Sequence, residues 1–193
     1  MEMLSNDSPT RHYYKDDELN RLFAEIPERF QPHFTTLLYT GIRKGEIMLL
    51  EWEDIHFEEG YIYIKPHEGR TRRKMKPRII PIHAEVMKAF EIRKQAKESK
   101  KIVFSAREGK VLTHNVLYEV LRMAKKSANV QSGCLHSFRH TFASKLINKG
   151  ISIKVVQELL GHEDIKTTEI YSHIDIKQFK HILSLALDFK IAA

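Results

Sequence analysis

Residues 54–82, DIHFEEGYIYIKPHEGRTRRKMKPRIIPI, differ in character from the sequence on either side. Within them, residues 54–57 and 61–65 alternate apolar and polar side chains around an EEG turn, and residues 78–82 form a third apolar run. This pattern predicts three short antiparallel strands. Pro81 suits the end of an edge strand, because it has no backbone donor. An extended basic loop, residues 67–77, separates the last two strands.

Helical spacing of apolar residues predominates on both sides of this segment. The predicted helices are residues 15–25, 34–40, 44–50, 84–98, 114–127, 137–148, 153–160, 167–172 and 176–189. Thr113 and Ser152 are placed to cap two of them, and Gly41 and Gly161 to end two others. The sequence therefore predicts a mainly α protein with a small three-stranded antiparallel β-sheet, an α+β fold, after an irregular segment over residues 1–14.

The composition narrows the class of protein. The 193 residues fit a single domain, and 42% hydrophobic with 30% charged residues is typical of a globular chain. No apolar run approaches the roughly 18 residues that a membrane span needs, and the N-terminus lacks the apolar stretch of a signal peptide. Cys134, the single cysteine, excludes an internal disulfide and a cysteine-based zinc site. We therefore expect a cytoplasmic protein without a membrane partner.

The formal net charge of +7 favours a polyanionic partner, because phosphates attract basic surfaces and release counterions on binding. Charge alone is a weak signal, since many basic proteins never contact nucleic acid.

Four segments combine arginine, lysine, histidine and tyrosine in one order. They are TGIRKGEI (40–47), GRTRRKMKPR (69–78), HSFRHTFAS (136–144) and LLGHEDIKTTEIYSH (159–173). Arg43 follows a glycine break, His136 precedes Arg139 by about one helical turn, and Tyr171 follows His162 by nine residues.

Taken together, these segments resemble the tyrosine recombinase (phage integrase) family, whose catalytic pattern is Arg, Lys, His-x-x-Arg, His or Trp, then Tyr. The resemblance runs from Arg43 to Tyr171, nearly the whole chain. It implies the tyrosine recombinase catalytic-domain fold and site-specific recombination of double-stranded DNA, by integration or excision. It also implies an enzyme without metal or cofactor and a tetrameric synapse on DNA, and a monomer is compatible with the chain in isolation.

The resemblance assigns the catalytic roles. Tyr171 would attack phosphorus and form a 3′-phosphotyrosyl link. Arg43 and Arg139 offer permanently charged forks that match the non-bridging phosphate oxygens. His162 would add a hydrogen bond to the phosphate, and His136 would carry a proton near neutral pH.

The acid that protonates the leaving oxygen is, in the family, a lysine between the second and third strands. The usual offset from RIIPI falls on Arg73, which is a poor proton donor because its pKa exceeds about 12. We therefore predict Lys74, with Lys76 and Lys65 as alternatives.

Residues 65–78 hold seven Lys and Arg against one Glu. We predict that this loop contacts DNA phosphates, although a solvated basic turn is the alternative. The expected contacts are Arg70, Arg72, Arg73, Lys76 and Arg78. Glu46 is expected to support Arg43 or a neighbouring basic group, and the alternative for that pair is an ordinary surface ion pair.

Other functions fit parts of the pattern. His136 with His140 resembles half of a zinc-binding helix, but the glutamate that HExxH needs beside its first histidine is missing, so no metal is expected. A type IB topoisomerase uses a similar tyrosine chemistry. A catalytically inactive DNA-binding accessory protein is the alternative outside the enzymes.

We expect residues 1–193 to be one catalytic domain. Family members commonly carry an N-terminal domain that closes a clamp on DNA, and we expect this chain to lack it, as a truncated piece or a minimal recombinase. Weak, salt-sensitive DNA binding is then expected. The C-terminal segment, residues 176–193, is expected either to pack into a neighbouring protomer or to pack on its own domain.

Overall fold

The computed structural model describes residues 12–65, 77–106, 112–161, 176–189 and 191, with the side chains of residues 114 and 176–179 excepted. The elements in chain order are α1 Asp16–Glu25, η1 Glu28–Phe30, α2 Gln31–Thr40, α3 Lys44–Ile47, η2 Trp52–Asp54, β1 Ile55–His56, β2 Tyr61–Ile64, β3 Arg78–Pro81, α4 Ala84–Ala96, α5 His114–Ser127, α6 Leu135–Asn148, α7 Ile153–Leu160 and α8 Ile176–Ala186. The predicted fold class is confirmed.

The three strands form one antiparallel sheet in the order β1-β2-β3. Ile62 lies opposite both Ile55 and Ile80, and these three side chains point into the core. Pro81 lies on β3, an edge strand, as predicted. The first strand is shorter than predicted, because Asp54 still belongs to the η2 turn, where its carboxylate accepts a hydrogen bond from the Glu51 amide at 3.0 Å.

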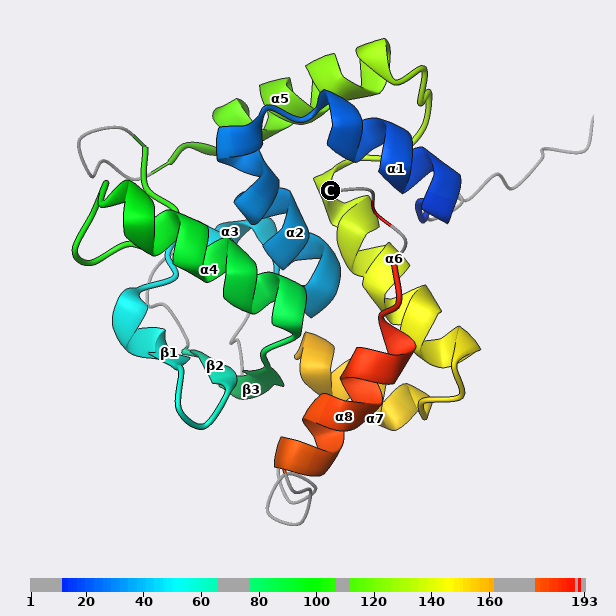
Figure 1. Cartoon of the computed structure of the whole chain (residues 1–193). Helices are drawn as coiled ribbons and strands as arrows, with labels where there is room; N and C mark the ends of the chain where they lie inside the picture. The colour runs from blue at the N-terminus through cyan, green and yellow to red at the C-terminus, as the bar shows by residue number, and fades with distance from the viewer. Residues whose placement is uncertain (1–11, 66–76, 107–111, 162–175, 190, 192–193) are drawn as a thin grey trace, which may run out of the picture.

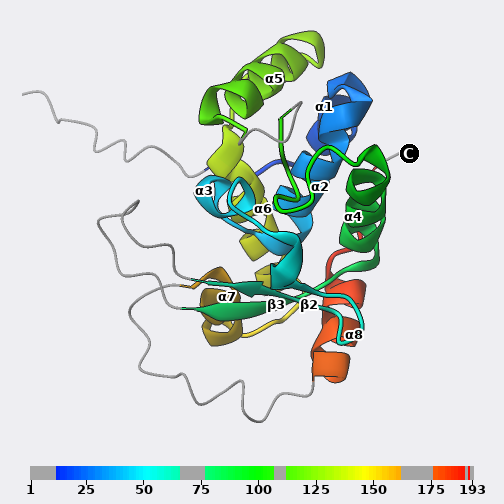
Figure 2. The same cartoon turned by 90° about the vertical axis from the view of Figure 1, so that its left-hand side faces the viewer.

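Helix α2 is the centre of the helical part and packs against α4 and α6, while α1 packs against α5. Helices α7 and α8 contact β3 at the end of the molecule away from α1 and α5 (Figures 1 and 2). The apolar stripe of α6, Phe138, Phe142 and Leu146, is fully buried, as its spacing predicts. No helix in the described ranges is long and apolar enough to cross a membrane.

Three of the helix ends that differ from the prediction do so for a local reason. Helix α2 begins at Gln31, earlier than predicted, because Pro32 fits the first turn of a helix. Helix α6 begins at Leu135, because the Cys134 amide donates to the Ser137 hydroxyl at 3.0 Å and so closes the first turn. Helix α4 ends at Ala96, because Lys97 adopts the left-handed conformation.

The C-terminal helix α8 ends at Ala186 rather than Phe189. Leu187 and Phe189 beyond it are buried, and the Tyr39 hydroxyl donates to the Phe189 carbonyl at 3.5 Å while the two rings meet edge to face. Helix α8 packs on β3 and α6 of its own chain, which is one of the two expected arrangements. The predicted helix over residues 167–172 and nearly all of the basic loop lie outside the described residues.

Candidate active site

The turn after α2 brings the chain close to two other helices. Gly41 has φ +60°, and a Cβ atom there would lie 2.6 Å from Phe142 Cδ1 and 2.8 Å from Leu160 Cδ2. Only glycine fits this combination of left-handed backbone and close approach without strain. The turn therefore places the next residues, Ile42 and Arg43, beside α6 and the end of α7.

Glu46 holds Arg43 at the start of α3. Its Oε2 accepts a hydrogen bond from the Arg43 amide at 2.7 Å, and its Oε1 accepts one from Arg43 Nη1 at 3.1 Å. The pair is not an ordinary surface contact, because the Glu46 side chain is only 4% exposed while that of Arg43 is 34% exposed. Arg43 is thus fixed in direction and still partly open to solvent.

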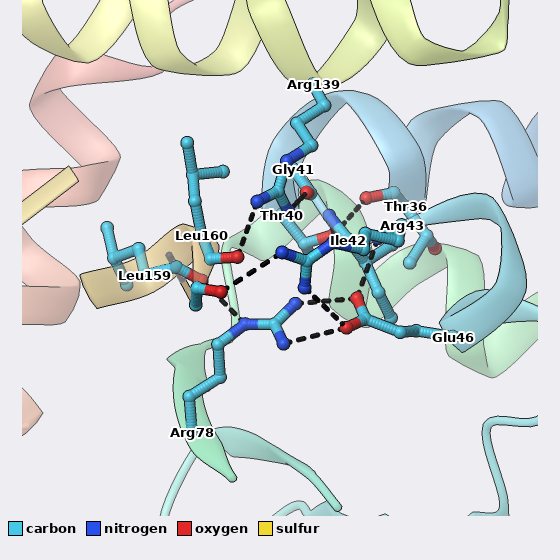
Figure 3. A network of polar contacts seen from close by, with 11 residues as sticks. Thr36, Thr40, Gly41, Ile42, Arg43, Glu46, Arg78, Arg139, Leu159 and Leu160 are labelled. Carbon is cyan, nitrogen blue, oxygen red and sulfur yellow. Dashed lines mark hydrogen bonds and ion pairs between the residues drawn. The ribbon is translucent and has the colours of Figure 1, made fainter. Parts of the chain in front are cut away.

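Arg139, on α6, is buried beside Arg43. Its Nη1 donates to the Gly41 carbonyl at 2.7 Å, and its Nη2 donates to the Leu160 carbonyl (Figure 3). Burial, together with the nearby charges of Arg43 and Arg78, lowers the pKa of Arg139 to about 9. The guanidinium therefore remains protonated at neutral pH, and a bound anion would relieve the repulsion around it.

Arg78, at the start of β3, is buried, although the sequence predicted that it contacts DNA. Its side chain is 3% exposed, and its Nη1 and Nη2 donate to the two carboxylate oxygens of Glu46 at 2.8 and 2.6 Å. The prediction that Arg78 contacts DNA does not fit this buried pair. The alternation of side chains along the strand could have predicted this burial, because Arg78 shares the face of Ile80 and Ile82, both fully buried.

The three arginines Arg43, Arg78 and Arg139, here called the arginine cluster, converge on the last carbonyls of α7. Nε of Arg78 donates to Leu159 at 2.8 Å, Arg139 donates to Leu160, and Nη2 of Arg43 donates to Gly161 at 3.0 Å (Figure 3). The Leu159 and Leu160 carbonyls belong to the last turn of α7, where carbonyls lack a partner within the helix and the helix dipole is negative. The cluster thus fixes the chain where it leaves α7.

The charges around Glu46 are not balanced within the cluster, because one carboxylate faces three guanidinium groups. Burial alone raises the pKa of Glu46, but the hydrogen bonds and charges of Arg78 and Arg43 outweigh it, and the pKa lies below its ordinary value. Glu46 is therefore ionised, and the formal charge of the group is still positive by two. Such a group suits an anion with several oxygens, such as a phosphate.

His136 lies exposed in the first turn of α6, with its ring 4.6 Å from that of His140 in a T-shaped arrangement. It lies one turn before Arg139, as the spacing predicts. Several predicted site residues lie outside the described residues, namely Arg70, Arg72, Arg73, Lys74, Lys76, His162 and Tyr171. Gly161, the residue before His162 in the sequence, is the last one described at this end of the site.

Lys65, an alternative for the leaving-group acid, forms ion pairs with three carboxylates. Its Nζ lies 2.7 Å from Glu53, 3.0 Å from Asp54 and 3.4 Å from Glu51. The hydrogen bond to Glu53 raises the pKa of Lys65, because these carboxylates favour the protonated form. A more tightly held proton makes Lys65 a poor acid for this role.

The sequence matches the model of the phage integrase family over residues 12–178. The chain belongs to the phage integrase family. The relatives described below are named tyrosine recombinases, and they are longer than this chain. It is 30% identical to the tyrosine recombinase XerA of Pyrococcus furiosus, over 89% of this chain and 60% of that protein. It is 32% identical to the tyrosine recombinase XerC of Pseudomonas aeruginosa, over 83% of this chain and 51% of that protein.

Solved structures of integrase-like proteins share the fold. A crystal structure of XerA recombinase superposes with a TM-score of 0.67 at 26% identity, over 90% of this chain and 64% of that one. The Tn1549 transposon integrase, in complex with circular intermediate DNA, superposes with a TM-score of 0.72 at 22% identity, over 84% and 61%. This phage integrase family chain thus spans between 51% and 64% of the length of the relatives and solved structures named above.

Proposed function

We propose that this chain is the catalytic domain of a tyrosine recombinase, which breaks and rejoins DNA strands without a metal through Tyr171. The observation that supports the proposal is the arginine cluster. Arg43 and Arg139 come from distant parts of the sequence and meet at the end of α7, directly before His162. The relatives named tyrosine recombinases support the same proposal, because they match most of this chain.

The proposed reaction conserves the phosphodiester bond energy. The Tyr171 oxygen attacks phosphorus and loses its proton, the bond from phosphorus to the 5′ oxygen breaks, and that oxygen takes up a proton. A 3′-phosphotyrosyl link and a free 5′ hydroxyl result. Attack by the 5′ hydroxyl of another strand reverses the step and exchanges the strands.

The residues of the site then have distinct tasks. Arg43 and Arg139 neutralise the non-bridging oxygens, on which charge builds in the transition state, an effect worth about 3–4 kcal/mol per donor in other enzymes. His162 adds a further hydrogen bond to the phosphate. His136, exposed at the start of α6, exchanges the proton with Tyr171 or with the returning hydroxyl.

Lys74 is the proposed acid for the leaving oxygen, with Lys76 as the alternative, because Lys65 is held by carboxylates. Four basic residues of the same loop would contact the DNA backbone. They are Arg70, Arg72, Arg73 and Lys76. Arg78 is left out of this set, since its guanidinium is buried against Glu46.

We further propose that residues 1–193 act as one catalytic domain in the cytoplasm, with double-stranded DNA as the substrate. The chain would be a monomer alone and assemble into a tetramer on DNA. Light scattering without DNA, and with a bound duplex, measures both states. Deletion of residues 176–193 tests whether α8 joins protomers, and an unchanged mass on DNA would count against that exchange.

The direct test traps the covalent link. The chain is fused to a sequence-specific DNA-binding domain, which raises its local concentration on the substrate. The fusion is mixed in EDTA with nicked duplexes that carry the target of that domain beside a randomised region, and detergent then stops the reaction. We expect DNA covalently bound to the protein. Tyr171→Phe should abolish it, and Tyr118→Phe, which changes an exposed tyrosine on α5, should retain it.

The negative outcomes are distinct. An adduct that requires added magnesium would contradict the metal-free mechanism. An adduct that survives Tyr171→Phe would assign the nucleophile elsewhere. No adduct despite binding of the duplex would leave the DNA-binding accessory protein as the better description.

A further inference from the structure

Arg78 uses all three of its guanidinium nitrogens within the protein. Nε donates to the Leu159 carbonyl at 2.8 Å, and the other two donate to the Glu46 carboxylate at 2.8 and 2.6 Å. Arg78 thus forms a two-pronged ion pair and a third hydrogen bond with one planar group, which suits arginine and does not suit lysine. Its burial separates Arg78 from any DNA phosphate at the surface.

The contacts of Arg78 join two parts of the candidate active site. One part is Glu46, which also binds the amide and the guanidinium of Arg43. The other is the end of α7, where a Cβ atom on Gly161 would lie only 3.0 Å from Arg78 Cδ. Gly161 has φ +66°, so the chain turns sharply beside Arg78 before it continues to His162.

We propose that Arg78 is a positioning residue of the strand-cleavage reaction, which sets both Arg43 and the exit of the chain from α7 without touching DNA. This inference rests on the proposed function. It assigns to Arg78 a role opposite to that of the neighbouring basic loop. The loop residues act on the DNA backbone, whereas Arg78 acts through Glu46 and through the Leu159 carbonyl.

A small displacement of Arg43 or of the end of α7 is enough to slow the reaction. Misplacing a catalytic group by about 1 Å can cost about 100-fold in rate, because the reacting atoms must meet in line. Lysine at position 78 keeps the positive charge but offers a single ammonium in place of the planar fork. Arg78→Lys therefore separates geometry from charge.

Arg93 provides a matched control. It is also a buried arginine, 5% exposed, with one carboxylate partner, Glu98 at 2.6 Å, and with bonds to the Val103 and Ser105 carbonyls. It lies on α4, and its hydrogen-bond partners in the described part of the chain are Glu98, Val103 and Ser105, none of which belongs to the arginine cluster. Arg93→Lys thus disturbs an equivalent buried pair elsewhere in the fold.

The experiment compares the unsubstituted chain, Arg78→Lys and Arg93→Lys, all in the DNA-binding fusion, on a duplex recovered from the trapping selection. We measure the single-turnover rate of adduct formation at saturating DNA, the Kd for DNA and the melting temperature. Arg78→Lys should slow adduct formation by about tenfold to 100-fold, with Kd within about twofold. Arg93→Lys should keep the rate within about twofold, although both variants lose thermal stability.

A second readout does not depend on catalysis. The Gly161 amide donates to the Glu158 carbonyl at 2.9 Å, and its hydrogen exchange reports the order of the α7 end. Arg78→Lys should speed its exchange by about tenfold or more relative to the Val156 amide at the helix start, and Arg93→Lys should leave that ratio unchanged. If the unsubstituted chain forms no adduct, the proposed function fails, and an unchanged Gly161 ratio would still refute the positioning role.

Three results would overturn the proposal. One is a rate of adduct formation in Arg78→Lys equal to that of the unsubstituted chain. Another is a loss of rate in Arg93→Lys as large as that in Arg78→Lys, which would reflect general destabilisation. The third is a Kd for DNA that rises well beyond twofold in Arg78→Lys, the sign that the guanidinium itself contacts DNA. If Arg78→Lys does not fold, the double variant Glu46→Leu/Arg78→Met replaces the buried pair by apolar groups, and it must fold and show the same slow step.

Discussion

Arg139 donates a hydrogen bond to the carbonyl of Gly41 across 2.7 Å, and so links α6 directly to the turn that presents Arg43. The same turn is closed on its other side by Phe142 and Leu160, which leave no space for a Cβ atom on Gly41. The two arginines of the site therefore share one rigid support. Its glycine is a structural requirement of the site rather than a flexible hinge.

Gly41→Ala should destabilise the protein by about 2–4 kcal/mol, because alanine adds both left-handed strain and a clash with Phe142. Urea unfolding followed by circular dichroism measures the change. Gly45→Ala is the matched control, since nothing lies within 4 Å of its Cβ position and it belongs to helix α3. That control should be neutral or gain up to about 1 kcal/mol. Equal effects of the two substitutions would refute the close approach at Gly41.

Glu46→Gln should cost about 3–5 kcal/mol of unfolding free energy, because it leaves the buried charge of Arg78 without a compensating carboxylate. The comparison is Glu119→Gln, which breaks an exposed pair with Arg122 on α5. An exposed pair contributes little, so that variant should stay within about 1 kcal/mol of the parent. A loss for Glu46→Gln no greater than that for Glu119→Gln would contradict the buried network.

His33 should make the protein less stable in mild acid. Its ring is buried between Phe30 and Phe104, and neither ring nitrogen has a hydrogen-bond partner in the described part of the chain. Burial, with the charge of Arg93 in support, lowers the pKa of His33 to about 3. The unfolded chain therefore takes up the proton first, near pH 6.5, and acidification from that point favours unfolding.

The unfolding free energy of the parent should fall by about 2 kcal/mol more than that of His33→Leu between pH 7 and pH 5. Urea unfolding at both pH values gives this difference. His181→Leu, at an exposed position of α8, should keep the pH dependence of the parent. If His33→Leu shows the same pH dependence as the parent, His33 is not the responsible group.

DNA binding by the chain alone should be weak and should depend steeply on salt. Replacing Arg70, Arg72 and Arg73 by alanine should lower the slope of log K against log salt by about 2–3, because each lost phosphate contact removes about 0.9. Fluorescence anisotropy with a labelled duplex at several salt concentrations measures it. Arg21, Arg29 and Lys88, exposed on other elements, form a control triple with the same change in charge. Nanomolar affinity that resists physiological salt would contradict this expectation.

The order of four short motifs was enough to predict the family, while the catalytic roles of Arg43, His136 and Arg139 stay predictions. The spacing of apolar residues was enough to predict the α+β fold class. Local spacing carries this information, because helices and strands impose periods of 3.6 and 2 on buried side chains. Ile62, Ile80 and the α6 stripe from Phe138 to Leu146 were readable in that way.

The role of Arg78 was not readable from the order of motifs, although its position in the β3 alternation pointed inward. A buried charge is stable only where a partner meets it, and the partners of Arg78 lie 32 and 81 residues away, at Glu46 and Leu159. Packing of β3 against α7 brings these groups together. Local sequence thus defines which face of a strand an arginine occupies, whereas the assembled fold decides whether that arginine meets DNA or another part of the protein.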